Sequence, residues 1–272
     1  MTSFDKRQAK HGRQVKGSLG KKIGFISALG GQGTSLSAAY IAKASASSGR
    51  SSVLVDTCGF GGTLSYMLGS AEDAVMNIND AASGECLIED ALTDCGDHLR
   101  LLPSASFPER TYSPLSLDVR RVIESLSREY DVFADIPSGT LPDCGMAGCF
   151  DMFVICTRAD VMSLKYASML CRMIRKASAQ TASPCSIRLL ITRFIPEIMK
   201  FGGIADIDRC IDTVGARLIG VMPHDNRALE AVLAGQQPDE KCELMRYARD
   251  TAERIAGKRV PLDGGRSFRL PI

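Results

Sequence analysis

The amino-acid sequence predicts an α/β fold, a mainly parallel sheet with helices on both of its faces. Short and nearly continuous apolar runs alternate along the chain with segments of helical periodicity, which is the pattern of parallel strands buried on both faces. The first apolar run leads directly into a glycine-rich loop and a helix of small residues. A chain of 272 residues is long enough to give such a domain a large core. We therefore expect about seven or eight strands in one sheet.

Each expected strand is a short apolar run in which β-branched residues, leucine and phenylalanine predominate. Two of these runs carry an aspartate at or next to their carboxyl end, Asp56 and Asp135. Ligands of open α/β sheets bind at that rim, so these two aspartates are candidate site residues. In chain order the expected strands cover 23–28, 52–56, 99–103, 132–136, 152–156, 187–192 and 218–222.

Helices are expected between these strands. The first, over 35–47, is rich in small residues and is closed by Gly49 as a C-cap. The second, over 117–129, places apolar residues such as Val119 and Val122 on one face. The remaining expected helices cover 164–176, 226–234 and 240–256.

Composition argues against several classes of protein. No apolar run reaches the length of about 18 residues that a membrane-spanning helix needs. The first 20 residues lack an apolar core, which argues against a secretory signal. We expect the 10 cysteines to stay reduced in the cytoplasm, and their spacing includes no Cys-x-x-Cys pair that would suggest a metal site. Four of them are expected to fill the core, namely Cys144, Cys149, Cys156 and Cys171.

Charge is distributed unevenly between the amino-terminal arm and the body. Residues 1–22 hold seven lysines and arginines against one acid, a net charge of +6, and the remaining residues carry −4. We interpret 1–20 as a flexible basic leader, 21–258 as one domain and 259–272 as a polar tail without an apolar helical stripe. The leader is expected mainly to solubilise the protein. Contact with an acidic lipid surface or with nucleic acid is the alternative.

The glycine-rich loop has the arrangement that cradles phosphate, because backbone N–H groups and the helix dipole both point at the anion. Its residues that would face a nucleotide are Gly30, Gly31, Gly33, Thr34, Ser35 and Leu36. The run Leu-Gly-Gly-Gln-Gly-Thr-Ser resembles the deviant Walker A loop of the MinD/ParA family of P-loop ATPases, whose pattern is K-G-G-x-G-K-[ST]. The resemblance implies a P-loop NTPase-like fold.

The resemblance to this family extends over most of the chain. Residues 53–56 followed by 63–69 look like the second acidic strand and switch region of the family. Residues 131–139 resemble its Walker B strand, with the D-x-P-[AS]-G pattern starting at Asp135. Residues 151–163 resemble the next strand and loop, and the segments that match the base side of the family are 190–194 and 218–225.

The resemblance implies ATP or ADP with Mg²⁺ as the cofactor. Ser35 occupies the position whose hydroxyl binds Mg²⁺, although it could equally cap its helix. Asp135 would act through a metal-bound water. Asp56 would belong to the metal shell or to the switch region, and a simple capping role is an equally good interpretation for it. Arg193 would meet the base or ribose, and a surface salt bridge is nearly as good an interpretation.

Three positions depart from the family pattern. Leu29 occupies the position of the signature lysine, which in a dimer of the family reaches the phosphates of the partner. Thr34 occupies the position of the loop lysine. Cys58 occupies the position of a second acid, two residues after Asp56. Loss of one preorganised charge or donor from such a site costs about 10²–10³ in rate. We expect hydrolysis to be very slow or absent and assign no catalytic residue, whereas nucleotide binding should suffer less.

The functional prediction is a MinD-like nucleotide-binding protein of spatial regulation, placing a division site or a cell pole, with weak or lost hydrolysis. The alternatives are a pseudo-ATPase scaffold and a ParA-like protein that positions a pilus or flagellum by protein–protein binding. A homodimer and a protein partner are expected. The acidic body disfavours specific binding to nucleic acid. The expected location is cytoplasmic, with peripheral contact at the inner face of the membrane through the basic arm as a further expectation.

Overall fold

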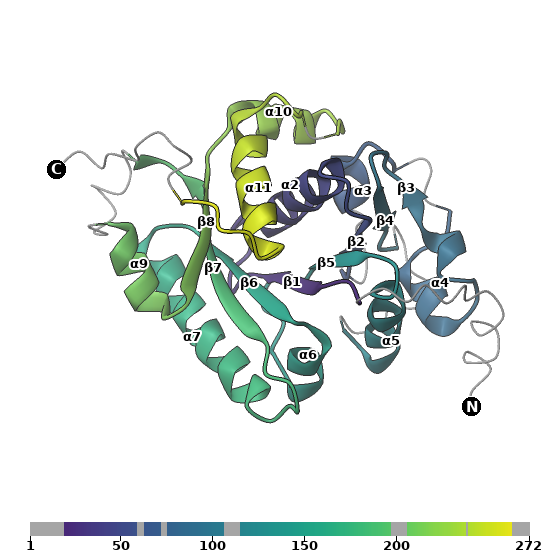
Figure 1. Ribbon diagram of the computed structural model, residues 1–272, viewed down its shortest axis with the longest axis horizontal. Coiled ribbons are helices and arrows are strands. Elements are labelled where there is room, and N and C mark those ends of the chain that lie inside the picture. The colour runs from purple at the N-terminus through teal and green to yellow at the C-terminus, as the bar shows by residue number, and fades with distance from the viewer. Residues whose placement is uncertain are drawn as a thin grey trace.

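A computed structural model describes residues 19–58, 63–71, 75–105, 115–196, 206–237 and 239–262. These residues form the predicted α/β fold, with eight strands in the order β3-β4-β2-β5-β1-β6-β7-β8 (Figure 1). Neighbouring strands are parallel except for β3, which runs antiparallel to β4 at the edge of the sheet. The strands are β1 (Lys22–Ile26), β2 (Ser52–Asp56), β3 (Thr93–Asp94), β4 (Leu99–Leu102), β5 (Asp131–Asp135), β6 (Met152–Thr157), β7 (Ser186–Phe194) and β8 (Arg217–Pro223).

Helices cover the sheet on both faces, as predicted (Figure 1). One buried cluster lies between the sheet and α4, α5, α6, α7 and α9. The opposite cluster lies between the sheet and α2, α3, α10 and α11. The bounds are α2 (Thr34–Ser47), α3 (Thr63–Met67), α4 (Ile78–Ser83), α5 (Leu117–Leu126), α6 (Cys144–Cys149), α7 (Val161–Ser178), α9 (Ile207–Val214), α10 (Asn226–Leu233) and α11 (Glu243–Ile255), with a short 3-10 helix at Glu89–Ala91.

The structure departs from the sequence prediction in its short elements. All seven predicted strands and five predicted helices are present, and all but β2 have shifted ends. Strand β3 and helices α3, α4, α6 and α9 were not predicted, because runs this short carry little periodicity and several are mostly small or polar. Cys149, Cys156 and Cys171 are buried as expected, but Cys144 is exposed. It begins α6, whose inward residues are Met146, Ala147 and Cys149.

The predicted division of the chain is only partly covered. Residues 1–18 of the predicted leader and 263–272 of the predicted tail lie outside the described residues. The body from β1 to α11 is joined by one sheet. Within the described segments, no helix is both long and apolar enough to cross a bilayer.

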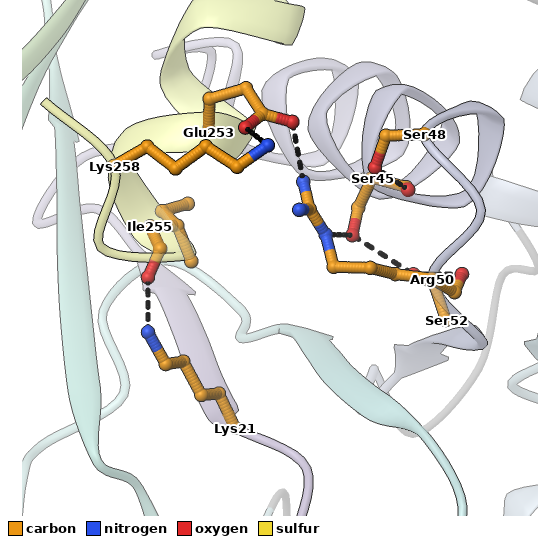
Figure 2. A network of polar contacts seen from close by, with 8 residues as sticks. All are labelled: Lys21, Ser45, Ser48, Arg50, Ser52, Glu253, Ile255 and Lys258. Atoms are coloured by element: carbon orange, nitrogen blue, oxygen red, sulfur yellow. Dashed lines mark hydrogen bonds and ion pairs between the residues drawn. The ribbon is translucent and has the colours of Figure 1, made fainter. Parts of the chain in front are cut away.

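A polar network fastens α11 to the rest of the body (Figure 2). The Arg50 guanidinium donates to Glu253 Oε1 at 3.1 Å and to Ser45 Oγ at 3.2 Å. Lys258 pairs with the other oxygen of Glu253 at 2.5 Å. Lys21 Nζ donates to the carbonyl of Ile255 at 2.6 Å, which ties the start of β1 to the last turn of α11. The network joins segments from opposite ends of the chain.

Replacing Glu253 with glutamine is expected to lower the free energy of unfolding by up to about 1 kcal/mol at pH 7, the usual scale for a partly exposed ion pair. Hydrogen bonding to Lys258, and then Arg50, holds the pKa of Glu253 below its ordinary value. A lowered carboxyl pKa stabilises the fold above the unfolded pKa, and that stability is lost as the pH falls through the folded pKa. Denaturant unfolding should therefore show a difference in the free energy of unfolding between variant and wild type that shrinks as the pH falls toward about 4. Glu243→Gln, which removes an exposed pair within α11, is the control and should give a smaller gap.

Candidate functional site at the carboxyl edge of the sheet

The site lies where the carboxyl ends of the central strands meet. Strand β1 lies between β5 and β6, and the glycine loop leaves its carboxyl end. Because β1, β5 and β6 are mutually parallel, the residues that follow them emerge at the same edge. The structure thus brings the loop next to Asp135. A Cβ built on Gly30 would lie 3.7 Å from Ser138 Oγ, three residues past the end of β5.

The glycine loop adopts a conformation that its sequence favours. Gly31 has φ +72° and Gly33 has φ +78°, in the left-handed region that side chains disfavour. Gly33 is the N-cap of α2, and among the described residues no side chain caps that helix. The N–H groups of its first turn are therefore left for another acceptor. An anion is the ligand that such a helix start suits.

Two neighbouring strands hold the loop in place through Gln32. Its side-chain oxygen accepts a hydrogen bond from the N–H of Arg158, after β6, at 2.8 Å. Its carbonyl accepts from the hydroxyl of Thr192, in β7, at 2.5 Å. Gln32 is buried. These contacts could not be predicted from the sequence, because Gln32 occupies the variable position of the loop pattern.

Ser35 and Asp135 form the polar pair at the base of the site. The Ser35 side chain is hydrogen-bonded to the Asp135 carboxyl group. Burial, opposed by that hydrogen bond and reinforced by the charge of Asp56, raises the pKa of Asp135 to about 7. Asp56 lies beside it in the register of β2 and β5. A hydroxyl and a carboxylate next to open N–H groups are the oxygen ligands and phosphate contacts that Mg²⁺ with a nucleotide requires.

Asp56 is occupied by contacts within the protein. Its carboxylate accepts from the N–H of Cys58 at 3.0 Å and bonds to the N–H of Leu64, at the start of α3, and to Ser104. Burial raises its pKa in spite of these bonds. Asp56 therefore bonds to Cys58 just after β2 and to the start of α3, contacts that favour the capping interpretation over metal binding.

Leu29, Thr34 and Cys58, which replace two lysines and an acid of the family pattern, bring no charged side chain to the site. Thr34 is 8% exposed, and its hydroxyl donates to Ser27 Oγ at 2.9 Å, which in turn donates to the carbonyl of Leu29 at 3.0 Å. The Thr34 hydroxyl is thus directed into the protein. Burial, with the charges of Asp56 and Asp135, raises the pKa of Cys58, so its thiol stays protonated.

Arg193 lies beside the third glycine of the loop. A Cβ built on Gly33 would lie 3.8 Å from Cγ and Nε of Arg193. Arg193 is exposed and has φ +49°, an unusual value for a residue with a side chain. It lines a hollow with Leu36 and His224. Within the described part of the chain, no carboxylate lies at ion-pair distance from it, which weighs against the salt-bridge interpretation.

The predicted nucleotide and metal positions thus divide into two groups. Gly30, Gly31, Gly33, Ser35, Asp135 and Arg193 surround one edge, whereas Asp56 and Thr34 are directed to internal partners. No cluster of three or more His, Cys, Asp or Glu side chains that could hold a metal alone occurs among the described residues. Mg²⁺ commonly binds through one or two protein oxygens together with phosphate and water, so this donor set fits it.

Comparison with known proteins gives relatives along most of the chain. No family model matches. The septum site-determining protein MinD of Bacillus subtilis is 25% identical over 252 residues, covering 90% of this chain and 92% of the relative. MinD of Escherichia coli K12 is 25% identical over 257 residues, covering 89% and 93%.

Solved structures share the fold. The MinD chain matched in the MinC:MinD cell division complex of Aquifex aeolicus has a TM-score of 0.75 at 22% identity, covering 89% of this chain and 98% of that one. MinD of Pyrococcus horikoshii, complexed with Mg-ADP, has a TM-score of 0.72 at 20% identity, covering 87% and 96%. A ParA family ATPase of Chlorobium tepidum has a TM-score of 0.69 at 22% identity, covering 87% and 98%. The resemblance to the MinD/ParA family is confirmed in sequence and in fold.

Proposed function

We propose that this MinD-like protein binds ATP or ADP with Mg²⁺ at the glycine loop and serves spatial regulation, the placement of a division site or cell pole, with slow or lost hydrolysis. The observation that carries the proposal is the glycine loop itself. It presents an uncapped helix start beside the Ser35–Asp135 pair, but lysine is missing at 29 and 34. The sequence relationship to the MinD proteins supports the cellular role.

Each part of the site has a role in this proposal. The N–H groups of the glycine loop and of Ser35 and Leu36 would hold the phosphates. Ser35 would bind Mg²⁺ directly, and Asp135 would accept a hydrogen bond from a metal-bound water. Arg193 lies beside Gly33 and would meet the base or ribose. Bound Mg²⁺ would neutralise part of the phosphate charge.

Slow hydrolysis follows from the charges at the site. A loop lysine holds a full positive charge beside the transferred phosphoryl group, where it stabilises the negative charge that develops on that group in the transition state. Thr34 directs its hydroxyl to Ser27 instead, and Leu29 offers no charge. The backbone and Ser35 remain, so binding is retained better than turnover.

A pseudo-ATPase scaffold is the second candidate. The inward hydrogen bond of Thr34 and the internal bonds of Asp56 favour it, because both side chains serve the fold without a ligand. A ParA-like protein that positions a pilus or flagellum would share the same scaffold. In each case we propose a homodimer and a protein partner. One of the structural relatives is a complex of MinD with MinC.

We expect weak, Mg²⁺-dependent nucleotide binding with little preference for ATP over ADP. The missing lysines would have touched the γ-phosphate, so ADP loses less from their absence. Isothermal calorimetry with and without Mg²⁺, run beside a hydrolysis assay, measures this. Tight ATP binding without Mg²⁺ would contradict the proposed role of the metal. Absence of binding of either nucleotide at millimolar concentration would leave the scaffold function.

Deletion of residues 1–20 is expected to abolish any binding to anionic vesicles and to leave the melting temperature almost unchanged. A basic residue near an anionic leaflet contributes about 1 kcal/mol, so the net charge of +4 on residues 1–20 supports salt-sensitive adsorption. Sedimentation with phosphatidylglycerol vesicles at low and high salt measures the effect. If the truncated protein still sediments, the arm is not the membrane contact.

A further inference from the structure

Strands β6, β7 and β8 are neighbours in the sheet (Figure 1), and a cavity of about 250 Å³ lies at their carboxyl ends. We call it the arginine cavity. Four of its lining side chains are polar, Arg158, Asp160, Arg193 and His224, and Phe194 and Ile195 are among the apolar ones. Pockets that hold a whole drug-sized ligand measure roughly 300–1,000 Å³. The arginine cavity is therefore of a size for one part of a nucleotide, and not for all of it.

The arginine cavity adjoins the hollow at the start of α2, because Arg193 and His224 line both spaces. The hollow also contains Gly33, at the uncapped helix start where the phosphates of a nucleotide would lie. A second link to the loop comes from Arg158, whose N–H donates to the side chain of Gln32 at 2.8 Å. A ligand held at the glycine loop therefore has the arginine cavity as its neighbouring space.

A bulge in β7 places Arg193 at this edge. The register of β7 and β8 shifts just before Phe194, and Arg193 lies in the shifted part with φ +49°, which is unfavourable for a residue with a side chain. On one side of the bulge, the Thr192 hydroxyl donates to the carbonyl of Gln32 at 2.5 Å. On the other side, the N–H of His224 donates to the carbonyl of Phe194 at 3.0 Å. Bulges beside functional sites redirect a side chain, and here the redirected side chain is that of Arg193.

The arginine cavity holds more positive charge than negative. Arg158 Nε pairs with Asp160 Oδ2 at 3.3 Å. Asp160 is also the N-cap of α7, where its carboxylate accepts from the N–H of Ser163 at 2.9 Å. Among the described residues, no other carboxylate lies at ion-pair distance from Arg158, and none lies at that distance from Arg193. Two arginines thus stand against one aspartate, which is shared with a helix start.

We propose that the arginine cavity is a second anion subsite, which takes a phosphate carried on the ribose of the nucleotide. The ligand class is then nucleotides with a 2′- or 3′-phosphate in addition to their 5′-phosphates. This inference rests on the proposed nucleotide binding at the glycine loop. Guanidinium groups bind phosphate through paired N–H donors, which makes arginine the preferred residue for such a group.

The distribution of charge along the site favours a phosphate on the ribose over a longer phosphate chain. The loop has no lysine at 29 or 34, so a γ-phosphate meets no cation from these positions. Arg193 lies beside Gly33, at the position proposed for the base or ribose, and also lines the arginine cavity. A substituent on the ribose is thus the part of a nucleotide that reaches the two arginines.

Isothermal calorimetry with Mg²⁺ on the full chain tests the proposal. The ligands are ADP, ADP with a 2′-phosphate, ADP with a 3′-phosphate, ATP and inorganic phosphate. ATP is the control ligand, because its additional phosphate extends the 5′ chain and not the ribose. The variants are Arg158→Gln, which keeps the backbone N–H that bonds to Gln32, and the control Arg128→Gln. Arg128 is exposed and follows Ser127, whose carbonyl accepts from the N–H of Gly20 at the opposite, amino edge of the sheet.

At least one of the two ribose-phosphorylated ligands is expected to bind wild type about tenfold or more tightly than ADP, the scale of one hydrogen bond to a charged group. ATP should bind about as tightly as ADP. Arg158→Gln should remove the gain from the ribose phosphate and leave the affinity for ADP unchanged, whereas Arg128→Gln should keep the gain. Equal melting temperatures show that both variants fold like wild type.

Binding of ADP without a gain from either ribose phosphate would overturn the inference and leave the proposed nucleotide binding intact. A gain that Arg158→Gln retains would place the phosphate outside the arginine cavity and overturn the inference as well. Binding of inorganic phosphate that Arg158→Gln abolishes, without a gain from the ribose phosphate, would assign the arginine cavity to a free anion instead. Absence of binding of every nucleotide at millimolar concentration would contradict both the inference and the proposed nucleotide binding.

Discussion

Introducing Leu29→Lys together with Thr34→Lys is expected to raise ATP turnover by about 10²-fold or more, if the rest of the site is intact. Each substitution restores a positive charge at a position where the family pattern has one. The uncapped start of α2 already supplies backbone N–H groups for the phosphates, and the Ser35–Asp135 pair supplies the oxygen atoms for Mg²⁺. Turnover with Mg²⁺ and saturating ATP is the measurement.

The structure also indicates what the double variant must rearrange. Thr34 is 8% exposed, and its hydroxyl bonds to Ser27. A lysine at 34 has to direct its ammonium group away from the buried position of the Thr34 hydroxyl and toward the glycine loop, because a buried charge without a partner is costly. Ser27 then loses one hydrogen bond, which costs about 1 kcal/mol of folding stability. A small drop in melting temperature is therefore expected beside the gain in turnover.

The matched control is Leu29→Met with Thr34→Met, which adds length at both positions without charge. It should leave turnover at the wild-type level. A gain in the methionine control equal to that in the lysine variant would show that side-chain length, and not charge, limits the reaction. No gain in the lysine variant would mean that the site is degenerate beyond these two positions, with Cys58 the next position to restore.

The fold was largely predictable because its strands are long enough to show their burial in the sequence. The predicted strand over 52–56 matches β2 residue for residue, and the others are shifted by one or two residues at an end. Short elements gave no comparable signal. Helix α6, for example, contains two glycines and two cysteines in six residues and owes its start to a cap from Asp143.

The candidate site was predictable where a motif fixes both residue type and position. The glycine loop, Ser35 and Asp135 come together as the motif predicts. The tie between Gln32 and Thr192 joins residues that are 160 positions apart in the chain, and neither residue type marks the contact. Likewise, only the structure shows that Asp56 bonds to the N–H of Cys58 and that Thr34 bonds to Ser27. Side-chain direction at a known position is set by packing, which the sequence pattern does not report.

Asp135→Asn is expected to stabilise the protein more at pH 8 than at pH 5, by on the order of 2 kcal/mol or more, in the absence of nucleotide and metal. Burial raises the pKa of Asp135 to about 7, above its unfolded value of 3.8. Between these values the folded state holds a proton that the unfolded state releases, so stability falls as the pH rises through this window. Each unit of difference corresponds to about 1.4 kcal/mol. Asparagine stays neutral and keeps a polar partner for Ser35.

Denaturant unfolding at pH 5 and pH 8 measures this difference, with Asp208→Asn as a control that removes an exposed carboxylate of α9. The control should show the same small effect at both pH values.

Mg²⁺ with ADP should stabilise wild type more at pH 8 than at pH 6, because the metal requires the ionised carboxylate. At pH 8 it should stabilise the Asp135→Asn variant less than it stabilises wild type. A variant that is less stable than wild type at pH 8 without ligand would show that the ionised Asp135 has a stabilising partner in the free protein. A pH-independent gap would show instead that the carboxyl group is ionised in the folded protein throughout this range, and the predicted rise of the pKa of Asp135 would then be wrong.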